Sequence, residues 1–414
     1  MIGLLTPNKW FRAAYGTQLR EFLREHTRVH LLIDFGHSHN LFPDQDTFPA
    51  ACILQPVNAR VADEGSLRFV RAHDTDRRRL PLNDLIAQTA VVVRHKDLRG
   101  DRWQLENVNE GLLLDRLLST GTSVAKYVGC KPIRGILTGL NEAYYVSTPL
   151  RNSMVDEDPT CASLIRPFLR GRDVKRWNSQ WADQWHIVIA SSHNHKWPWS
   201  DAGDEQQAER VFASTHPAVH RHLKTYEEKL RVRSDKGVFW WELRSCDYYQ
   251  AFEEPKIVVQ CIAYFSRFAL DTQGHIVNNK VLFLPTGDLY LLGILNSRIS
   301  WWIINRTFQH MKDDGLSIDV QFLLALPVPV VPQALRNGIV EAVDALVNAG
   351  PSDAASIEHH LYELVAQAFT LSEEDRVVLE SSLPARDPLV TIGAAETGMA
   401  EDGAVEISES TSLA

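Results

Sequence analysis

The sequence is short of cysteine and of long apolar runs. Its five cysteines are scattered, without any Cys-x-x-Cys spacing, which argues against a disulfide framework and against a structural zinc site. The most apolar stretch, residues 322–335, is interrupted by three prolines and is too short to span a bilayer. The first residues have neither the basic leader nor the apolar length of a signal peptide. These absences predict a cytoplasmic protein that does not act at a membrane.

Motifs that bind phosphate or activate a serine are missing too. The sequence has no Gly-x-Gly-x-x-Gly, no Walker A sequence and no Gly-x-Ser-x-Gly.

The net charge is −9, but residues 387–414 hold six acids and no lysine or arginine, which leaves −3 for residues 1–386. The composition of that acidic tail predicts disorder. A mildly acidic body is compatible with nucleic-acid binding where basic side chains cluster locally.

The first 60 residues have the pattern of an α/β fold. Apolar strands are predicted at residues 3–5, 29–33 and 50–54, and a helix is predicted to begin at Thr17. The expected apolar face of this helix consists of Leu19, Phe22 and Leu23. Near-continuous apolar strands belong to sheets that are covered on both faces. We therefore expect these residues to be the closing part of a larger α/β domain.

The remainder divides into four predicted segments. An irregular linker with one strand at residues 67–70 is expected over 61–110, and a mixed α+β domain over 111–335. A helical extension is expected over 336–385, followed by the acidic tail over 386–414. In the mixed domain, strands are predicted at residues 255–260, 267–270 and 280–284. A helix is predicted from about Asp288, with an apolar stripe formed by Leu292, Leu295, Ile299, Trp302 and Ile303.

Basic residues interleaved with aromatic residues are the positive functional signal. Lysine and arginine bind phosphates, and aromatic rings stack on exposed bases. The basic residues form three groups: Arg166, Arg170, Arg172, Lys175 and Arg176; then Lys224, Lys229, Arg231, Arg233 and Lys236; then Arg244, Lys256 and Arg267. We expect part of the first group to line a cleft that faces residues 224–233. A solvated charged surface over an ordinary aromatic core explains the same composition.

Two other classes of function stay open at this stage. Asp247, Glu254 and Lys256 faintly match a metal-dependent nuclease pattern, and the chain could equally be a non-catalytic interaction protein. The Ser-His-Asn-His sequence at residues 192–195 and the histidines at 216, 220 and 222 fit surface positions better than metal ligation.

Several stretches of the chain match one known family in the expected order. They are Leu-Thr-Pro-Asn-Lys-Trp at 5–10, Ile-Asp-Phe-Gly at 33–36, Ile-Arg-Gly-Ile-Leu-Thr-Gly-Leu-Asn-Glu-Ala-Tyr at 133–144, Ile-Arg-Pro-Phe-Leu-Arg-Gly-Arg-Asp-Val at 165–174, Trp-Glu-Leu-Arg at 241–244, Pro-Lys-Ile at 255–257 and Leu-Pro-Val-Pro at 326–329. With these stretches the chain resembles the N6-adenine DNA methyltransferases of type II and IIG restriction–modification systems. Residues 1–57 are similar to the end of their catalytic domain, and residues 130–330 are similar to their TaqI-like C-terminal specificity domain.

The resemblance implies an incomplete end of a Rossmann-like methyltransferase domain, then a mixed α+β DNA target-recognition domain, then a short helical C-terminus. It implies double-stranded DNA as the partner and S-adenosylmethionine as the methyl donor of the intact enzyme. The family's Asn-Pro-Pro-Tyr-type motif and its glycine-rich donor site are absent from these residues. We therefore expect no catalytic residue, cofactor or metal in this chain alone, and a separately encoded N-terminal methyltransferase half as a possible partner. The predicted DNA-binding residues are Arg134, Thr138, Asn141, Arg166, Arg170, Arg172, Lys175, Arg176, Lys224, Arg231, Arg233, Arg244, Lys256 and Arg267.

Overall fold

The fold is taken from a computed structural model of the whole chain. It describes residues 1–11, 13–36, 41–42, 47–57, 65–72, 80–98, 103, 105, 108–311, 315–348 and 351–384. The predicted acidic tail lies outside the described residues. Within the described part, no helix is both long enough and apolar enough to cross a membrane.

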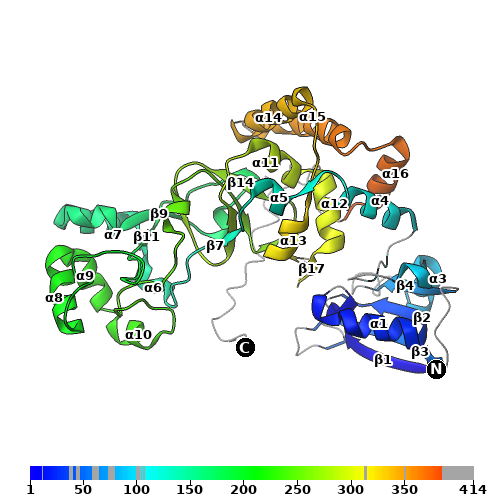
Figure 1. The fold of residues 1–414 in the computed structure, drawn as a ribbon, viewed down its shortest axis with the longest axis horizontal. Helices are drawn as coiled ribbons and strands as arrows, with labels where there is room; N and C mark the ends of the chain where they lie inside the picture. Colours follow the sequence, from blue (N-terminus) through cyan, green and yellow to red (C-terminus); the bar gives the residue numbers. More distant parts are fainter. Residues whose placement is uncertain are drawn as a thin grey trace.

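The N-terminal part is a mixed five-stranded sheet in the order β1-β3-β2-β4-β5 (Figure 1). Only β2 and β4 pair in parallel, and the other neighbours are antiparallel. Apolar side chains from alternate strand positions form separate buried clusters on the two faces of the sheet. The elements are β1 (Ile2–Pro7), α1 (Thr17–His26), β2 (Thr27–Asp34), β3 (Pro49–Pro56), β4 (Ser66–Arg71), α3 (Leu82–Thr89) and β5 (Val91–Arg94).

Two expectations for this sheet are wrong. Residues 61–110 are not an irregular linker, because β4 and β5 extend the same sheet and α3 lies between them. The apolar face of α1 is also different: Leu23 is buried together with Arg20, whereas Leu19 and Phe22 are exposed. The Arg20 guanidinium is buried because it donates to the carbonyl oxygens of Trp10 and Ala13, at 2.5 and 2.8 Å.

The centre of the molecule is a second five-stranded sheet in the order β10-β14-β12-β16-β7. Its side chains alternate between two large cores: Ile257 and Val259 belong to one, and Val258 belongs to the other. Both faces are therefore covered. The strands are β7 (Ile133–Arg134), β10 (Trp177–Asn178), β12 (Lys256–Gln260), β14 (Phe268–Asp271) and β16 (Val281–Leu284).

One core lies between the central sheet and a four-stranded sheet in the order β15-β9-β11-β8, with helices around it. Trp240 and Trp241 are buried here, so these two aromatic residues near the basic groups pack in the core. The elements are α6 (Asn141–Tyr144), β8 (Tyr145–Ser147), α7 (Thr148–Glu157), β9 (Ile165–Leu169), β11 (Gln184–Ile187), α8 (Glu205–Thr215), α9 (Pro217–Lys224), α10 (Glu227–Val232) and β15 (Ile276–Val277).

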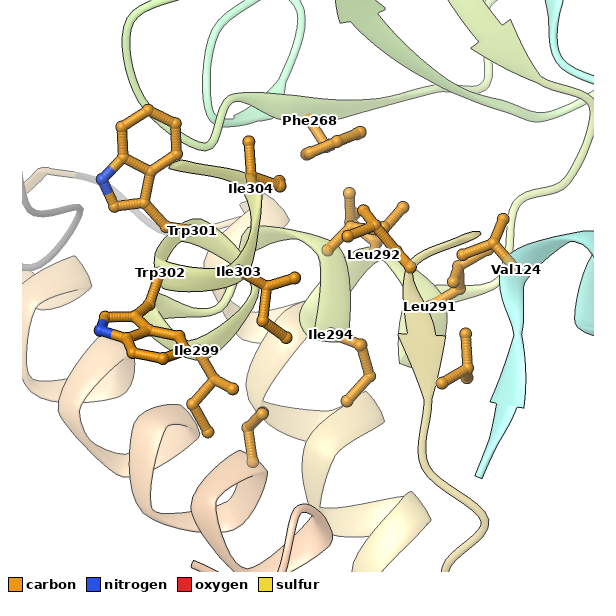
Figure 2. Close-up of a cluster of buried hydrophobic side chains, with 14 of the residues drawn as sticks. Val124, Phe268, Leu291, Leu292, Ile294, Ile299, Trp301, Trp302, Ile303 and Ile304 are labelled. Carbon is orange, nitrogen blue, oxygen red and sulfur yellow. The ribbon is translucent and has the colours of Figure 1, made fainter. Parts of the chain in front are cut away.

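The other core lies between the central sheet and the helices α11, α12, α14 and α15. Figure 2 shows Leu291, Leu292 and Ile294 of α11 beside Ile303 and Ile304 of α12 in this cluster. Because α14 and α15 bury their apolar faces in the same core, the predicted helical extension is packed onto the mixed domain. The helices are α4 (Val108–Leu118), α5 (Val124–Val128), α11 (Leu289–Asn296), α12 (Arg298–Thr307), α13 (Val320–Ala325), α14 (Gln333–Asn348), α15 (Pro351–Ala368) and α16 (Glu373–Ser381).

Short strands complete the fold. They are β6 (Thr122–Ser123) with β19 (Pro327–Val328), and β13 (Ile262–Ala263) with β18 (Leu316–Ser317) and β17 (Gln309–His310).

The helix predicted from Asp288 is divided into α11 and α12. Ser297 has extended backbone angles, and its hydroxyl accepts from the Ser300 amide at 3.1 Å, which caps the second helix. A capping box begins the last helix, α16: Ser372 and Asp375 each accept from the other's backbone amide.

Candidate nucleic-acid interface

Basic residues from distant parts of the sequence lie along one end of the central sheet. Gln260 ends β12 and lies opposite Val281, which begins the antiparallel strand β16. The neighbouring strands β14 and β10 are parallel to each other and begin at this same end. Arg267 directly precedes β14, and Lys175 lies two residues before β10. The strand register therefore places residues that are up to about a hundred positions apart in the sequence at the same end of the sheet.

Two more cations join this end from the other side of Gln260. Lys280 directly precedes β16, and its carbonyl oxygen accepts from the Cys261 amide at 2.8 Å. Arg134 lies on β7, opposite Leu282 of β16. Both side chains are exposed. We call the surface formed by Arg134, Arg172, Lys175, Arg267 and Lys280 the basic sheet end.

Arg172 is carried to the basic sheet end by a short 3-10 helix, η5 (Gly171–Asp173), that follows β9. The side-chain amide of Gln260 donates to the carbonyl oxygen of Gly171, which places η5 beside the end of β12. Arg172 is exposed, and its guanidinium forms no ion pair with any residue that the structure describes. Such a cation is available to an external anion.

Arg134 and Lys280 both lie near enough to Cys261 to affect its thiol. Burial raises the pKa of the Cys261 thiol, and the positive charges of Arg134 and Lys280 partly oppose that rise. The charge of Asp319 acts there in the opposite direction. Exposed cations such as Arg134 and Lys280 attract phosphate.

A family model matches most of the part of the chain that forms this surface. Residues 166–328 match the family model described as the TaqI-like C-terminal specificity domain. The chain carries this specificity domain. Arg172, Lys175, Arg267 and Lys280 lie within it, whereas Arg134 precedes the matched residues.

Two curated relatives are type II methyltransferases. The chain is 21% identical to M.PaeR7I of Pseudomonas aeruginosa over 82% of this chain, and 20% identical to M.BstVI of Geobacillus stearothermophilus over 92% of this chain. It spans 58% and 66% of the lengths of these two relatives. They support the resemblance to methyltransferases of restriction–modification systems.

A solved structure shares the fold of most of the chain. The type IIL restriction–modification enzyme MmeI in complex with DNA aligns with a TM-score of 0.55 and 11% identity, covering 95% of this chain and 50% of that one.

The second predicted basic group is neutralised by acids of neighbouring helices. Lys224 pairs with Glu209 and Glu227, at 2.5 and 2.7 Å, and Arg231 pairs with Glu227 at 2.8 Å. The neighbouring Lys229 and Lys236 are also occupied, by Glu142 and by the carbonyl oxygen of Arg231. Lys224 and Arg231 remain predictions as DNA contacts, as does a cleft between this group and the first. Their charges are already compensated within the protein.

Four predicted DNA contacts are wrong because their side chains are buried. Lys256 is fully buried, and its ammonium pairs with Asp271 at 2.6 Å. Arg233 is buried among main-chain carbonyl oxygens, including that of Trp240 at 3.1 Å. Arg176 forms a bidentate ion pair with Glu358, and the buried Thr138 hydroxyl donates to Asn141 at 2.7 Å. These residues stabilise the fold.

The remaining predicted residues keep some exposure but have partners. Arg166 pairs with Glu253 at 2.9 Å, Arg170 pairs with Asp173 at 2.9 Å, and Arg244 lies 3.5 Å from Asp235. Exposed Asn141 accepts the Thr138 hydroxyl. Their roles toward DNA stay predictions.

The nuclease interpretation has no assembled site in the described residues. Lys256 is buried, Glu254 is exposed, and Asp247 accepts a hydrogen bond from Asn194. No group of three or more His, Cys, Asp or Glu side chains there is placed to hold a metal ion. The histidines at 216, 220 and 222 contact different partners, namely Thr160, Glu209 and the Ala143 carbonyl oxygen.

Sequence reasoning missed Lys280 and Gln260. Neither lies in a basic run, and only the pairing of β12 with β16 brings them to the basic sheet end. The strands that flank them were predictable, but the strand order was not.

Proposed function

We propose that this chain is the DNA-reading part of a site-specific adenine-N6 DNA methyltransferase of a restriction–modification system. The basic sheet end is the observation that carries the proposal, because it places four exposed or partly exposed cations of the specificity domain on one surface. These side chains would contact phosphates and fix the register of the duplex. The planar guanidinium of Arg172 could also reach a guanine edge in the major groove.

Methyl transfer belongs to the intact enzyme in this proposal. The amino group of adenine is a weak nucleophile, so transfer from S-adenosylmethionine requires the flipped base and the donor methyl group to be held in line. The sequence of this chain has no Asn-Pro-Pro-Tyr-type motif and no glycine-rich donor turn. We therefore assign both to an upstream part of the enzyme, on the same or a separate chain.

An uncovered apolar surface on the N-terminal sheet supports this assignment. Ile2 and Leu4 are each 44% exposed on the edge strand β1, which pairs with β3 alone among the described strands. They lie opposite Leu54 and Cys52, on the sheet face against which α1 packs. Leu19 and Phe22 of α1 are exposed as well, and so is Tyr15 in the short 3-10 helix just before α1. Apolar side chains grouped in this way are typical of a surface that binds another protein segment.

Neutralising the basic sheet end tests the DNA-binding proposal. We expect the triple variant Arg134→Gln/Arg172→Gln/Lys280→Gln to bind every duplex more weakly. We also expect the slope of log affinity against log salt to become shallower by about 2 to 3, since each phosphate contact contributes roughly 0.9 to that slope. Fluorescence anisotropy between about 50 and 200 mM salt measures both quantities.

The matched control is Arg210→Gln on α8, which removes one exposed positive charge away from the basic sheet end. It should leave the salt slope unchanged. A folded triple variant with wild-type affinity and slope would contradict the proposal. If the wild-type chain itself shows no salt-dependent DNA binding, the non-catalytic interaction protein becomes the better interpretation.

A further inference from the structure

A buried carboxylate on the C-terminal helices holds the loop that carries part of the basic sheet end. Glu358 of α15 is 3% exposed and accepts three hydrogen bonds from two consecutive residues. Arg176 donates from Nε and Nη2 at 2.7 and 2.8 Å, and Trp177 donates from its indole at 2.5 Å. The donors and the acceptor come from positions that are about 180 residues apart.

The loop has a conformation that requires such support. Trp177 has a φ of 74°, in the left-handed region that a bulky side chain rarely adopts. Backbone of this kind costs roughly 1 to 3 kcal/mol and persists only where surrounding contacts enforce it. The Arg176 guanidinium lies 4.7 Å from the centre of the Trp177 ring and also donates to the Ser266 carbonyl oxygen at 2.8 Å.

The loop is otherwise a tight hairpin. Val174 bridges to Ser179, and the Lys175 amide donates to the Asn178 carbonyl oxygen at 3.2 Å. The side-chain amide of Asn178 reaches the Val347 carbonyl oxygen of α14 at 3.3 Å. The hydrogen bonds to Glu358 and to Val347 therefore tie the loop to the C-terminal helices, while Lys175 belongs to the basic sheet end.

We propose that Glu358 is a positioning residue for DNA binding, acting through Arg176 and Trp177 on Lys175. The inference rests on the proposed function and deepens it. The negative charge of Glu358 is surrounded by donors of the loop, so removing the charge releases Arg176 from its bidentate partner and leaves a buried cation without compensation. The loop then loses the conformation that directs Lys175 toward a phosphate.

The test is a double-mutant cycle that joins Glu358→Gln to Lys175→Gln. We expect Glu358→Gln to weaken DNA binding about fivefold and to make the salt slope shallower by roughly one, as expected for one lost phosphate contact. In the Lys175→Gln background the same change should have little further effect, because the contact it positions is already absent. A purely structural role would lower stability without this coupling.

Two further variants keep the test decisive. Glu363→Gln on the same helix breaks an ion pair with Arg376, on the side of α16, and should leave DNA binding unchanged. Trp177→Phe keeps an aromatic ring and removes the indole donor, so it should weaken DNA binding in the same way but by less than Glu358→Gln. If Glu358→Gln does not fold, Trp177→Phe tests the positioning role in its place.

The outcomes separate the two proposals. If the Arg134/Arg172/Lys280 variant weakens binding but folded Glu358→Gln and Trp177→Phe do not, the positioning role is overturned and the interface stands. If none of these variants changes binding, the proposed function itself fails.

Discussion

At the scale of single residues, His186 is buried in a neutral environment that leaves one ring nitrogen without a partner. Its Nδ1 lies 2.7 Å from the Ile187 carbonyl oxygen, and its Nε2 is buried without a hydrogen bond. The rings of Tyr144, Tyr145 and Phe168 surround it. Burial lowers the pKa of His186 from 6.5 to about 4, since a charged imidazolium would lose its hydration there.

This pKa predicts acid sensitivity. Between pH 6.5 and about 4 the unfolded chain binds a proton that the folded chain does not, so the free energy of unfolding should fall as the pH falls through this range. The contribution is about 1.4 kcal/mol per pH unit and about 3 kcal/mol in total. Urea unfolding at several pH values measures it. We expect His186→Phe to lose this component of the slope.

The control for that measurement is His193→Gln, which changes an exposed histidine of a surface loop. It should retain the wild-type pH dependence. An unchanged slope in His186→Phe would show that other groups cause the acid sensitivity.

At the scale of elements, a buried ion pair joins two strands of the central sheet. Lys256 and Asp271 are register partners on β12 and β14, and both side chains are fully buried. His275 donates to Asp271 at 2.7 Å, and the Gln273 amide does so at 3.1 Å. Burial alone raises the pKa of Asp271, but the hydrogen bonds from His275 and Lys256 and the positive charge of Lys256 outweigh it and hold that pKa below its usual range.

Breaking this pair should be costly. We expect Lys256→Met to lower the free energy of unfolding by about 3 to 5 kcal/mol, because it leaves the Asp271 charge buried without its cation. Lys280→Met is the control: its side chain is exposed at the next strand, and its effect should stay within about 0.5 kcal/mol. If chemical denaturation shows that the two changes lower the free energy of unfolding equally, Lys256 does not have this structural role.

Much of the element content was predictable, since local patterns determine it. The apolar runs predicted β12, β14 and β16, and the helical extension predicted over residues 336–385 contains α15. The sequence could not separate buried from exposed cations, because Lys256 and Lys280 have the same side chain and differ only in what the sheet places around them. Likewise, Phe22 continues the helical period of α1 but faces outward.

At the scale of the whole molecule, the chain combines a covered central sheet with an N-terminal sheet that has an uncovered apolar surface. The specificity domain has helices or a second sheet on both faces of its central sheet. By contrast, Ile2, Leu4 and Leu5 of β1 are exposed, and Phe22 of α1 is 57% exposed. In the proposed function, DNA reading therefore belongs to the covered part, and association with a catalytic part belongs to β1 and α1.

This division predicts that methylation is restored by association. We expect the purified chain to bind no S-adenosylmethionine and to transfer no methyl group. Co-expression with the part of M.PaeR7I or M.BstVI that this chain does not match should restore transfer of labelled methyl groups to adenine and should protect residues 1–57 from proteolysis.

Leu4→Glu/Phe22→Glu should abolish this association, because the charges would be buried against the partner. Val377→Glu, on an exposed position of α16, should not. Both variants should keep wild-type DNA affinity, since neither touches the basic sheet end. Methyl transfer by the purified chain alone would contradict this assignment, because the donor site would then have to lie within these 414 residues.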